Sequence, residues 1–148
     1  MRKTDMNISP LDLLNAAKAA AKHAYAPYSG CKVGAALLTR SGEVIPGCNV
    51  ENASFGVTCC AERTALFSAV ARGARRFDAI AVVCEKDGKI QDFFPPCGVC
   101  RQALAEFCGP DFAVILPAPD GGTRQMTLSE LLPCGFTGSQ VCTGEESE

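Results

Sequence analysis

The sequence contains no run of apolar residues that approaches the ~18 needed for a membrane-spanning helix. Its first ten residues are polar and lack the apolar stretch of a secretory signal. We therefore expect a cytoplasmic protein without a membrane anchor. Histidine occurs once, as His23, and we expect it to be an ordinary residue of the first helix rather than a metal ligand.

Basic residues are too few and too scattered for a nucleic-acid-binding protein. Lys and Arg number 14 against 16 Asp and Glu, which gives a net charge of -2 at pH 7. A short basic cluster lies within residues 72–76. Because polyanions normally bind to basic surfaces, we expect no nucleic-acid partner.

The sequence also lacks internal repeats and any linker that would separate two domains. A length of 148 residues suits one domain by the usual prior of roughly 100–200 residues per domain. A hydrophobic content of 47% is sufficient for a packed core. We predict a single domain over residues 1–148, of which about 138–148 form a loose polar tail.

Cysteine, in contrast, is abundant, with ten residues. In an exported chain this number would indicate a disulfide scaffold. Here the core is sufficient without cross-links, no export signal is evident, and several cysteines lie near a Cys-x-x-Cys pair. These observations favour a metal site in a reducing compartment.

Two short cysteine motifs carry the chemistry. The first is Cys60-Ala61-Glu62 and the second is Pro96-Cys97-Gly98-Val99-Cys100. Three thiolates occupy three corners of a zinc tetrahedron and leave the fourth for water, which is the arrangement of a catalytic zinc site. A glutamate beside that water can shuttle protons. This combination is the signature of zinc-dependent nucleobase deaminases.

The hydrophobic pattern predicts strands that alternate with helices. Helices are expected over residues 11–25, 61–71, 98–107 and from 127 onward, and strands over 33–39, 44–48, 79–84 and 112–116. Residues 49–58 have no clear period and should form a loop. This order indicates an α/β domain with a mixed sheet and helices on its faces.

Both cysteine motifs are expected at helix N-termini, so the two helix ends can point at one spot. Cys97 and Cys100 are three residues apart and should share one helix face. The positive ends of the two helices favour thiolates. Arg63 or Arg101 would be a natural donor to the sulfurs, withdrawing charge from them.

Two other interpretations of the cysteines remain open at this point. A closed structural zinc site could use Cys59 or Cys84 as its fourth ligand, with Glu62 as an unremarkable first-turn carboxylate. A redox Cys-x-x-Cys is less favoured, because such sites follow a strand and need no third cysteine.

The chain resembles the small cytidine deaminases of pyrimidine salvage, nearly from end to end. The segments that carry the resemblance occur in the family's order: Tyr25-Ala26-Pro27-Tyr28-Ser29 with residues 33–38, Gly47-Cys48-Asn49-Val50-Glu51-Asn52-Ala53-Ser54, Cys60 to Ala65, Pro96 to Gln102, and Leu131-Leu132-Pro133 with Phe136. The resemblance implies a three-layer α/β/α sandwich with a mixed five-stranded sheet.

The resemblance also implies roles for individual residues. Zinc, one ion per subunit, would be held by Cys60, Cys97 and Cys100, with Glu62 as general acid and base. Asn49 and Glu51 match positions that hydrogen-bond the ribose 3′-hydroxyl, Ala61 belongs to the substrate site, and Arg63 matches a donor to the zinc thiolates. Phe136 matches an aromatic that stacks on the base from a neighbouring subunit of a homotetramer with shared active sites.

Two positions depart from the family pattern. Cys31 stands where family members usually have Phe, and Phe55 where they often have Tyr. Cys31 offers less apolar surface to a base and sugar, and Phe55 lacks a hydroxyl that could reach the ribose. Both substitutions bear on substrate affinity and leave the zinc chemistry unaffected.

The leading expectation is hydrolytic deamination of cytidine and deoxycytidine to uridine and deoxyuridine, with release of ammonia. One alternative is a deaminase of another aminopyrimidine nucleoside, such as a blasticidin-type compound. Asn49 and Glu51 favour the first, because they address a free ribose. A polynucleotide deaminase would need a basic, aromatic groove. A non-catalytic zinc-binding module is opposed by Glu62.

Overall fold

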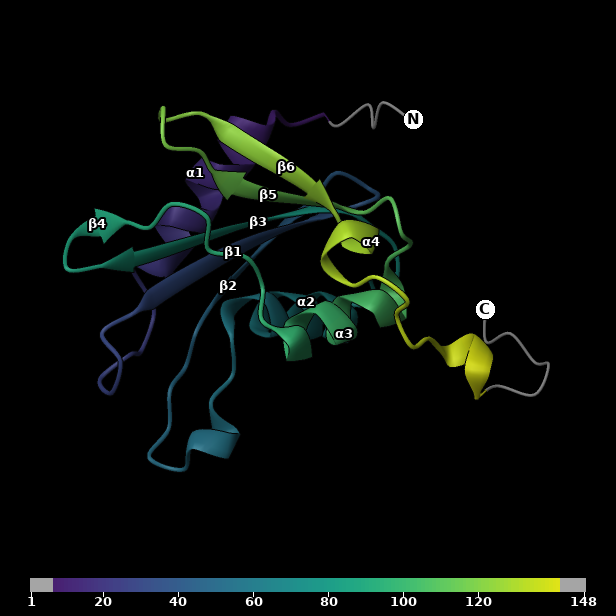
Figure 1. The fold of residues 1–148 in the computed structure, drawn as a ribbon, viewed down its shortest axis with the longest axis horizontal. Coiled ribbons are helices and arrows are strands. Elements are labelled where there is room, and N and C mark those ends of the chain that lie inside the picture. The colour runs from purple at the N-terminus through teal and green to yellow at the C-terminus, as the bar shows by residue number, and fades with distance from the viewer. Residues whose placement is uncertain (1–6, 142–148) are drawn as a thin grey trace.

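The computed structural model describes residues 7–141 (Figure 1). The chain forms, in order, α1 (Pro10–Ala21), β1 (Lys32–Thr39), β2 (Val44–Cys48), the 3₁₀ turn η1 (Phe55–Val57), α2 (Ala61–Ala71), β3 (Phe77–Lys86), β4 (Lys89–Ile90), α3 (Gly98–Phe107), β5 (Ala113–Pro117), β6 (Thr123–Thr127), α4 (Leu128–Leu131) and the 3₁₀ turn η2 (Gly138–Gln140). Most of the tail predicted over 138–148 lies outside the described residues.

The described strands form one mixed sheet in the order β2-β1-β3-β5-β6, with the two-residue β4 pairing the end of β3. The β3–β5 pair is parallel, and the other pairs are antiparallel. The predicted mixed sheet is therefore confirmed, and its five-stranded path is extended by β4. None of the helices within residues 7–141 has the length and apolarity needed to cross a membrane.

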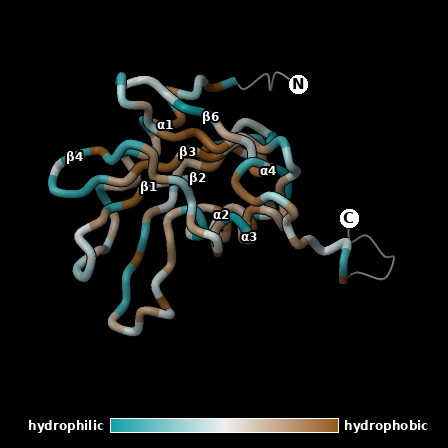
Figure 2. The backbone as a smooth tube through the Cα atoms, viewed as in Figure 1, coloured by the Kyte–Doolittle hydropathy of each residue, from teal (hydrophilic) through white to brown (hydrophobic). Residues whose placement is uncertain are grey.

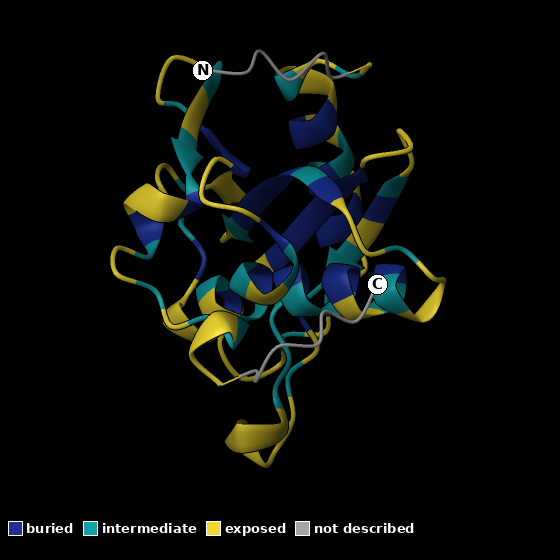
Figure 3. Cartoon of the chain, turned by 90° about the vertical axis from the view of Figure 1, so that its right-hand side faces the viewer, coloured by how far each residue is buried: buried dark blue, intermediate teal, exposed yellow. Residues whose placement is uncertain are grey.

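Helices cover both faces of this sheet. On one face α1 buries Leu13, Leu14 and Ala17 against inward residues of the strands such as Leu38 and Val83. On the other face α2, α3 and α4 pack against the remaining strand residues; this cluster includes Leu37, Ala65, Leu66, Ile80, Val82, Leu104, Val114 and Leu128. Figure 2 shows the apolar sheet between its helices, and Figure 3 shows that the same strands are buried. The predicted three-layer α/β/α sandwich is confirmed.

Helix α1 and two strands differ from the prediction, of which the two-residue β4 was not expected. Helix α1 ends at Ala21, not Tyr25, because the Tyr25 amide leaves the helix and donates to the Asn49 carbonyl oxygen at 3.0 Å. The strand β6 was not predicted, because its sequence Thr-Arg-Gln-Met-Thr has no apolar alternation. It is an edge strand whose partner is the buried β5.

Helix α2 lies unusually close to β2. A Cβ atom at Gly47 would lie 2.4 Å from the Ala61 carbonyl oxygen and 2.5 Å from the Ala65 nitrogen, so only glycine permits this approach. The Thr64 hydroxyl donates to the Cys48 carbonyl oxygen at 2.8 Å, across the same contact. The first turn of α2 is thereby held at a fixed place beside the end of β2.

Candidate metal centre and active site

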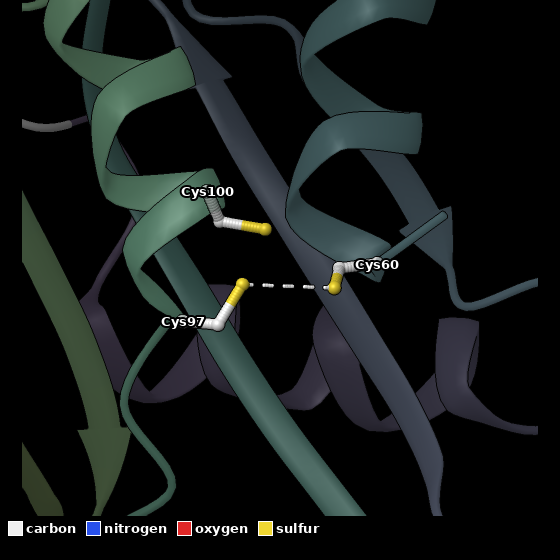
Figure 4. A group of neighbouring side chains, drawn as sticks. All are labelled: Cys60, Cys97 and Cys100. Carbon is white, nitrogen blue, oxygen red and sulfur yellow. Dashed lines mark hydrogen bonds between the residues drawn. The ribbon is translucent and has the colours of Figure 1, made fainter. Parts of the chain in front are cut away.

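The three predicted cysteines converge on the N-termini of two neighbouring helices (Figure 4). Cys60 is the N-cap residue of α2, Cys97 is the N-cap residue of α3, and Cys100 lies in the first turn of α3. Their sulfur atoms all lie within 4.8 Å of one another. The prediction that two helix ends would bring these thiols together is confirmed.

The spacing of the sulfurs suits zinc. With Zn–S bonds of about 2.3 Å, two sulfurs on a tetrahedron lie about 3.8 Å apart, and the Sγ atoms of Cys60 and Cys97 lie 3.9 Å apart. Two helix N-termini lie beside the cluster, and their partial positive charge stabilises thiolates. The three side chains therefore form a donor set that fits a zinc ion and leaves one corner of its tetrahedron open.

No further cysteine completes a closed site within residues 7–141. The metal-binding group holds only Cys60, Cys97 and Cys100, and neither Cys59 nor Cys84 belongs to it. All nine cysteines of the described segment are free thiols. The alternative of a structural site with a fourth thiolate from Cys59 or Cys84 is therefore not supported by the geometry.

The electrostatics of the cluster favour a bound cation. The pKa of Cys60 falls to about 5, because its thiolate accepts hydrogen bonds from Cys100 first and also from Arg63 and Cys97. The pKa of Cys100 is raised, because its proton is shared with Cys60 and because it is buried. The Cys60 thiolate is thus stabilised by its neighbours, and a bound cation would favour the deprotonated ligands that a metal site requires.

Arg63, not Arg101, is the guanidinium that contacts the sulfurs. Its Nη2 donates to Cys60 Sγ at 3.6 Å and to the Thr58 carbonyl oxygen at 3.4 Å. Its buried Nε has no acceptor among the residues that the structure describes. Arg101 instead donates to two backbone carbonyl oxygens, those of Pro96 at 2.7 Å and Leu131 at 2.6 Å.

Glu62 lies in the first turn of α2, two residues after the Cys60 cap. The residue is only 4% exposed, which is unusual for a carboxylate. Burial raises its pKa, and the nearby Cys60 thiolate acts in the same direction. A buried carboxyl group with a raised pKa binds a proton more readily than an exposed one, which suits a group that accepts and then delivers protons.

Asn49 has a buried side chain that binds the backbone at the start of β1. Its Oδ1 accepts from the Val33 amide at 2.8 Å, and its Nδ2 donates to the Cys31 carbonyl oxygen at 2.8 Å. An amide has two acceptor positions and two donor hydrogens. One of each therefore remains available for a further partner.

Glu51 binds the loop that leads into β1, at residues 28 and 29. Its Oε1 accepts from the Tyr28 and Ser29 amides at 2.9 and 3.0 Å, and its Oε2 accepts from the Ser29 hydroxyl at 2.6 Å. These bonds, that of the Ser29 hydroxyl first, lower the pKa of Glu51. The sequence did not predict Ser29 and Tyr28 as its partners, because no local period links residues 22 positions apart.

The remaining predicted residues occupy different surroundings. Ala61 is fully buried at the start of α2. Cys31 packs partly buried against the core. Phe55 is exposed, and its ring meets Tyr28 edge-on at 5.9 Å. Phe136 is 59% exposed on the segment after α4, and its carbonyl oxygen accepts from Gln102 Nε2 at 2.8 Å.

The family model described as "Cytidine and deoxycytidylate deaminase zinc-binding region" matches residues 9–116 of the chain. The chain belongs to this deaminase family. Its zinc-binding region includes both cysteine motifs, and zinc is the cofactor that the three thiols fit.

Known members of this deaminase family are similar over most of their length. A cytidine deaminase from Halalkalibacterium halodurans is 49% identical over 129 residues, which cover 87% of this chain and 95% of that protein. The crystal structure of a cytidine deaminase from Burkholderia pseudomallei is 50% identical, covers 87% of this chain and 100% of that chain, and has a TM-score of 0.79. A blasticidin-S deaminase from Bacillus cereus is 36% identical over 110 residues, 71% of this chain and 76% of that protein.

Proposed function

We propose that the protein deaminates cytidine and deoxycytidine hydrolytically to uridine and deoxyuridine, with release of ammonia. The observation that carries the proposal is the buried Glu62 beside three thiols whose sulfurs lie within 4.8 Å at two helix N-termini. The relatives with the higher identities are named cytidine deaminases, whereas the blasticidin-S deaminase is less similar. Deamination of another aminopyrimidine nucleoside, such as a blasticidin-type compound, is therefore not favoured.

Cys60, Cys97 and Cys100 would hold the zinc ion, which would supply the Lewis acidity that makes a water molecule a nucleophile at neutral pH. Glu62 accepts a proton from the attacking water. It delivers this proton to the ring nitrogen, then takes the remaining proton from the added hydroxyl group and gives it to the amine, which leaves as ammonia as the carbonyl group forms. A carboxylate so close to the metal ligands is what separates this site from a non-catalytic zinc module.

Arg63 tunes the charge of the ligands. Three thiolates give a zinc site a net charge of −1, which weakens its Lewis acidity relative to a histidine-rich site. The guanidinium donates to Cys60 and withdraws part of that charge. Its unpaired buried Nε offers a second donor to the same cluster.

Asn49 and Glu51 bind the ribose 3′-hydroxyl in this proposal. Each side chain already holds the backbone of residues 28–33, which fixes its orientation. The free donor of Asn49 and the one free acceptor position of Glu51, on Oε2, can then meet one hydroxyl, which both donates and accepts. Ala61, between Cys60 and Glu62, is the further residue that we assign to the substrate site.

We further propose a homotetramer in which neighbours complete each active site. Phe136 is exposed on a segment that extends away from the body of the subunit (Figure 1). Other exposed apolar residues offer surface for another copy: Tyr25, Tyr28, Val50, Phe55 and Val57. Phe136 of one subunit would stack on the base bound by the next.

The setting of the reaction follows from its chemistry. Free nucleosides are the substrates, so the enzyme acts in pyrimidine salvage, and we assign it to the cytoplasm, where thiols remain reduced. The net charge of -2 disfavours a polynucleotide substrate.

The direct test is turnover of cytidine by the zinc-loaded protein, followed by the change in absorbance and by ammonia release. Deoxycytidine, blasticidin S and a cytosine-containing single-stranded oligonucleotide serve as parallel substrates. We expect turnover of the two nucleosides. Turnover of blasticidin S with none of cytidine would replace the proposal by its alternative, and a zinc-loaded protein inactive on all four substrates would refute it.

A further inference from the structure

The C-terminal segment that carries Phe136 makes very few hydrogen bonds to the rest of its own subunit. In residues 133–141, the hydrogen bonds of Thr137, Ser139 and Gln140 all close within η2 and its cap. Among the described residues, one hydrogen bond joins this segment to the rest of the chain, and it runs from Gln102 Nε2 to the Phe136 carbonyl oxygen at 2.8 Å.

The segment also borders a cavity. A cavity of about 260 Å³ lies behind the segment, between it and helices α3 and α4. Its walls include Ala105, Cys108, Leu128, Leu132, Cys134 and Thr137. The backbone turns at Cys134 in the left-handed region, with φ of 53°. A segment that leaves its core over an open cavity needs a directional contact to fix where Phe136 points.

Gln102 belongs to the helix that bears two of the metal ligands. It follows Cys100 by two residues on α3. The intervening Arg101 donates from the same helix to the carbonyl oxygens of Pro96 and Leu131, which fixes the loop before Cys97 and the end of α4. One rigid helix therefore positions both the subunit's own thiols and the root of the segment that it presents outward.

We propose that Gln102 is a positioning residue that fixes Phe136 for the active site of a neighbouring subunit. The inference rests on the proposed shared active site. Gln102 does not touch substrate; its amide sets the backbone of Phe136, and the ring then closes the neighbour's base pocket. The zinc-bearing helix of one subunit thus determines substrate binding in the next.

The activity test is a double-mutant cycle between Gln102→Leu and Phe136→Ala. The leucine keeps the volume of Gln102 and removes its donor, whereas Phe136→Ala removes the ring and keeps the accepting carbonyl. Glu106→Leu is the matched control, because Glu106 is exposed on the same helix and makes no hydrogen bond or ion pair among the described residues.

We expect Phe136→Ala to raise KM for cytidine about 5- to 150-fold, the range of aromatic–base stacking. Gln102→Leu should raise KM by about 2- to 10-fold, the worth of one hydrogen bond. kcat and zinc content should change little in both. In the Phe136→Ala background, Gln102→Leu should have no further effect on KM. An equal effect in both backgrounds, or a normal KM in Gln102→Leu, would overturn the role of Gln102.

A second measurement does not depend on activity. The chain has no tryptophan, so Phe136→Trp introduces a single tryptophan whose fluorescence reports on this position. Adding Gln102→Leu should lower its fluorescence anisotropy, and adding Glu106→Leu should not. Gln102→Glu, which cannot donate to a carbonyl as a carboxylate, should act as Gln102→Leu does if the leucine variant fails to fold.

The two measurements separate the failure modes. If Phe136→Ala has a normal KM, the shared-site part of the proposed function fails, and the role of Gln102 fails with it. If Phe136→Ala raises KM but Gln102→Leu changes neither KM nor the anisotropy, only the role of Gln102 fails.

Discussion

Gly47 of β2 and Ala61 of α2 are in such close contact that a Cβ atom at position 47 would lie 2.4 Å from the Ala61 carbonyl oxygen. That oxygen belongs to the backbone of the first turn of α2, between a metal ligand and Glu62. The contact therefore links the packing of the sheet directly to the placement of the reactive groups.

Gly47→Ala should consequently damage both stability and activity. The added methyl group must push α2 away from β2, and such overpacking costs about 1–3 kcal/mol of unfolding free energy. A shift of about 1 Å at Glu62 can cost about 10²-fold in activity. Urea denaturation and cytidine turnover check this. Gly109→Ala is the control, because a Cβ there meets nothing within 4 Å; equal behaviour of the two variants would contradict the argument.

Zinc should be present at one ion per chain and should support the fold. A ligand at 100 times its dissociation constant stabilises by about 2.7 kcal/mol, which corresponds to a shift of about 5–10 °C in Tm for a domain of this size. Elemental analysis measures the content, and thermal unfolding with and without a chelator measures the shift. Active, unchelated protein that contains no zinc would end the metal argument.

Glu62→Gln should keep the fold and the metal but lose about 10²- to 10⁴-fold in kcat. The amide fills the same buried space and cannot carry the proton. Turnover, zinc content and circular dichroism should be measured together, with Glu106→Gln on the exposed face of α3 as a control. Near-normal turnover by folded, zinc-loaded Glu62→Gln would remove Glu62 from the mechanism.

Arg63→Ala should reduce activity and zinc affinity by about 10- to 100-fold, the usual cost of losing a donor to metal ligands. Arg63→Lys should recover only part of this loss, because the ammonium lacks the planar pair of donors. Arg72→Ala is the control. It removes an exposed arginine at the opposite end of α2, which forms an ion pair with Glu43 at 3.6 Å. If Arg63→Ala and Arg72→Ala gave the same activity and zinc affinity, Arg63 would be an ordinary solvated charge.

The bonds of Glu51 predict a pH dependence of stability. Because hydrogen bonds lower the pKa of Glu51 in the folded chain, its contribution is complete above the unfolded value of about 4.3. The contribution is lost as pH falls through the lower folded value. The difference in urea midpoint between the parent chain and Glu51→Gln should thus be constant above about pH 5 and shrink on acidification. A Glu51→Gln difference that grew in acid would reverse the sign of the argument.

Local signals were sufficient to predict the helices that carry the site. The bounds Ala61–Ala71 and Gly98–Phe107 match the prediction, because Gly73, with φ of 97°, follows the end of α2 and Gly109-Pro110 follow the end of α3. The meeting of Cys60 with Cys97 and Cys100 also followed from helix ends that share a ligand set.

Long-range contacts determine what the sequence did not predict. Strand β6 exists because its backbone pairs with the buried β5, although its own side chains are polar. The early end of α1 depends on the Tyr25 amide bonding Asn49, and the choice of Arg63 over Arg101 depends on where two carbonyl oxygens lie. Such partners are far apart in sequence and leave no periodic trace.

The α1 layer has a practical consequence. Its buried side packs on the face of the sheet opposite the helices that bear the cysteines. Its outer side, which includes the exposed Asn15 and Ala19, is screened from the reactive groups by the sheet. A tether attached there would orient an immobilised enzyme with its catalytic layer toward the solution.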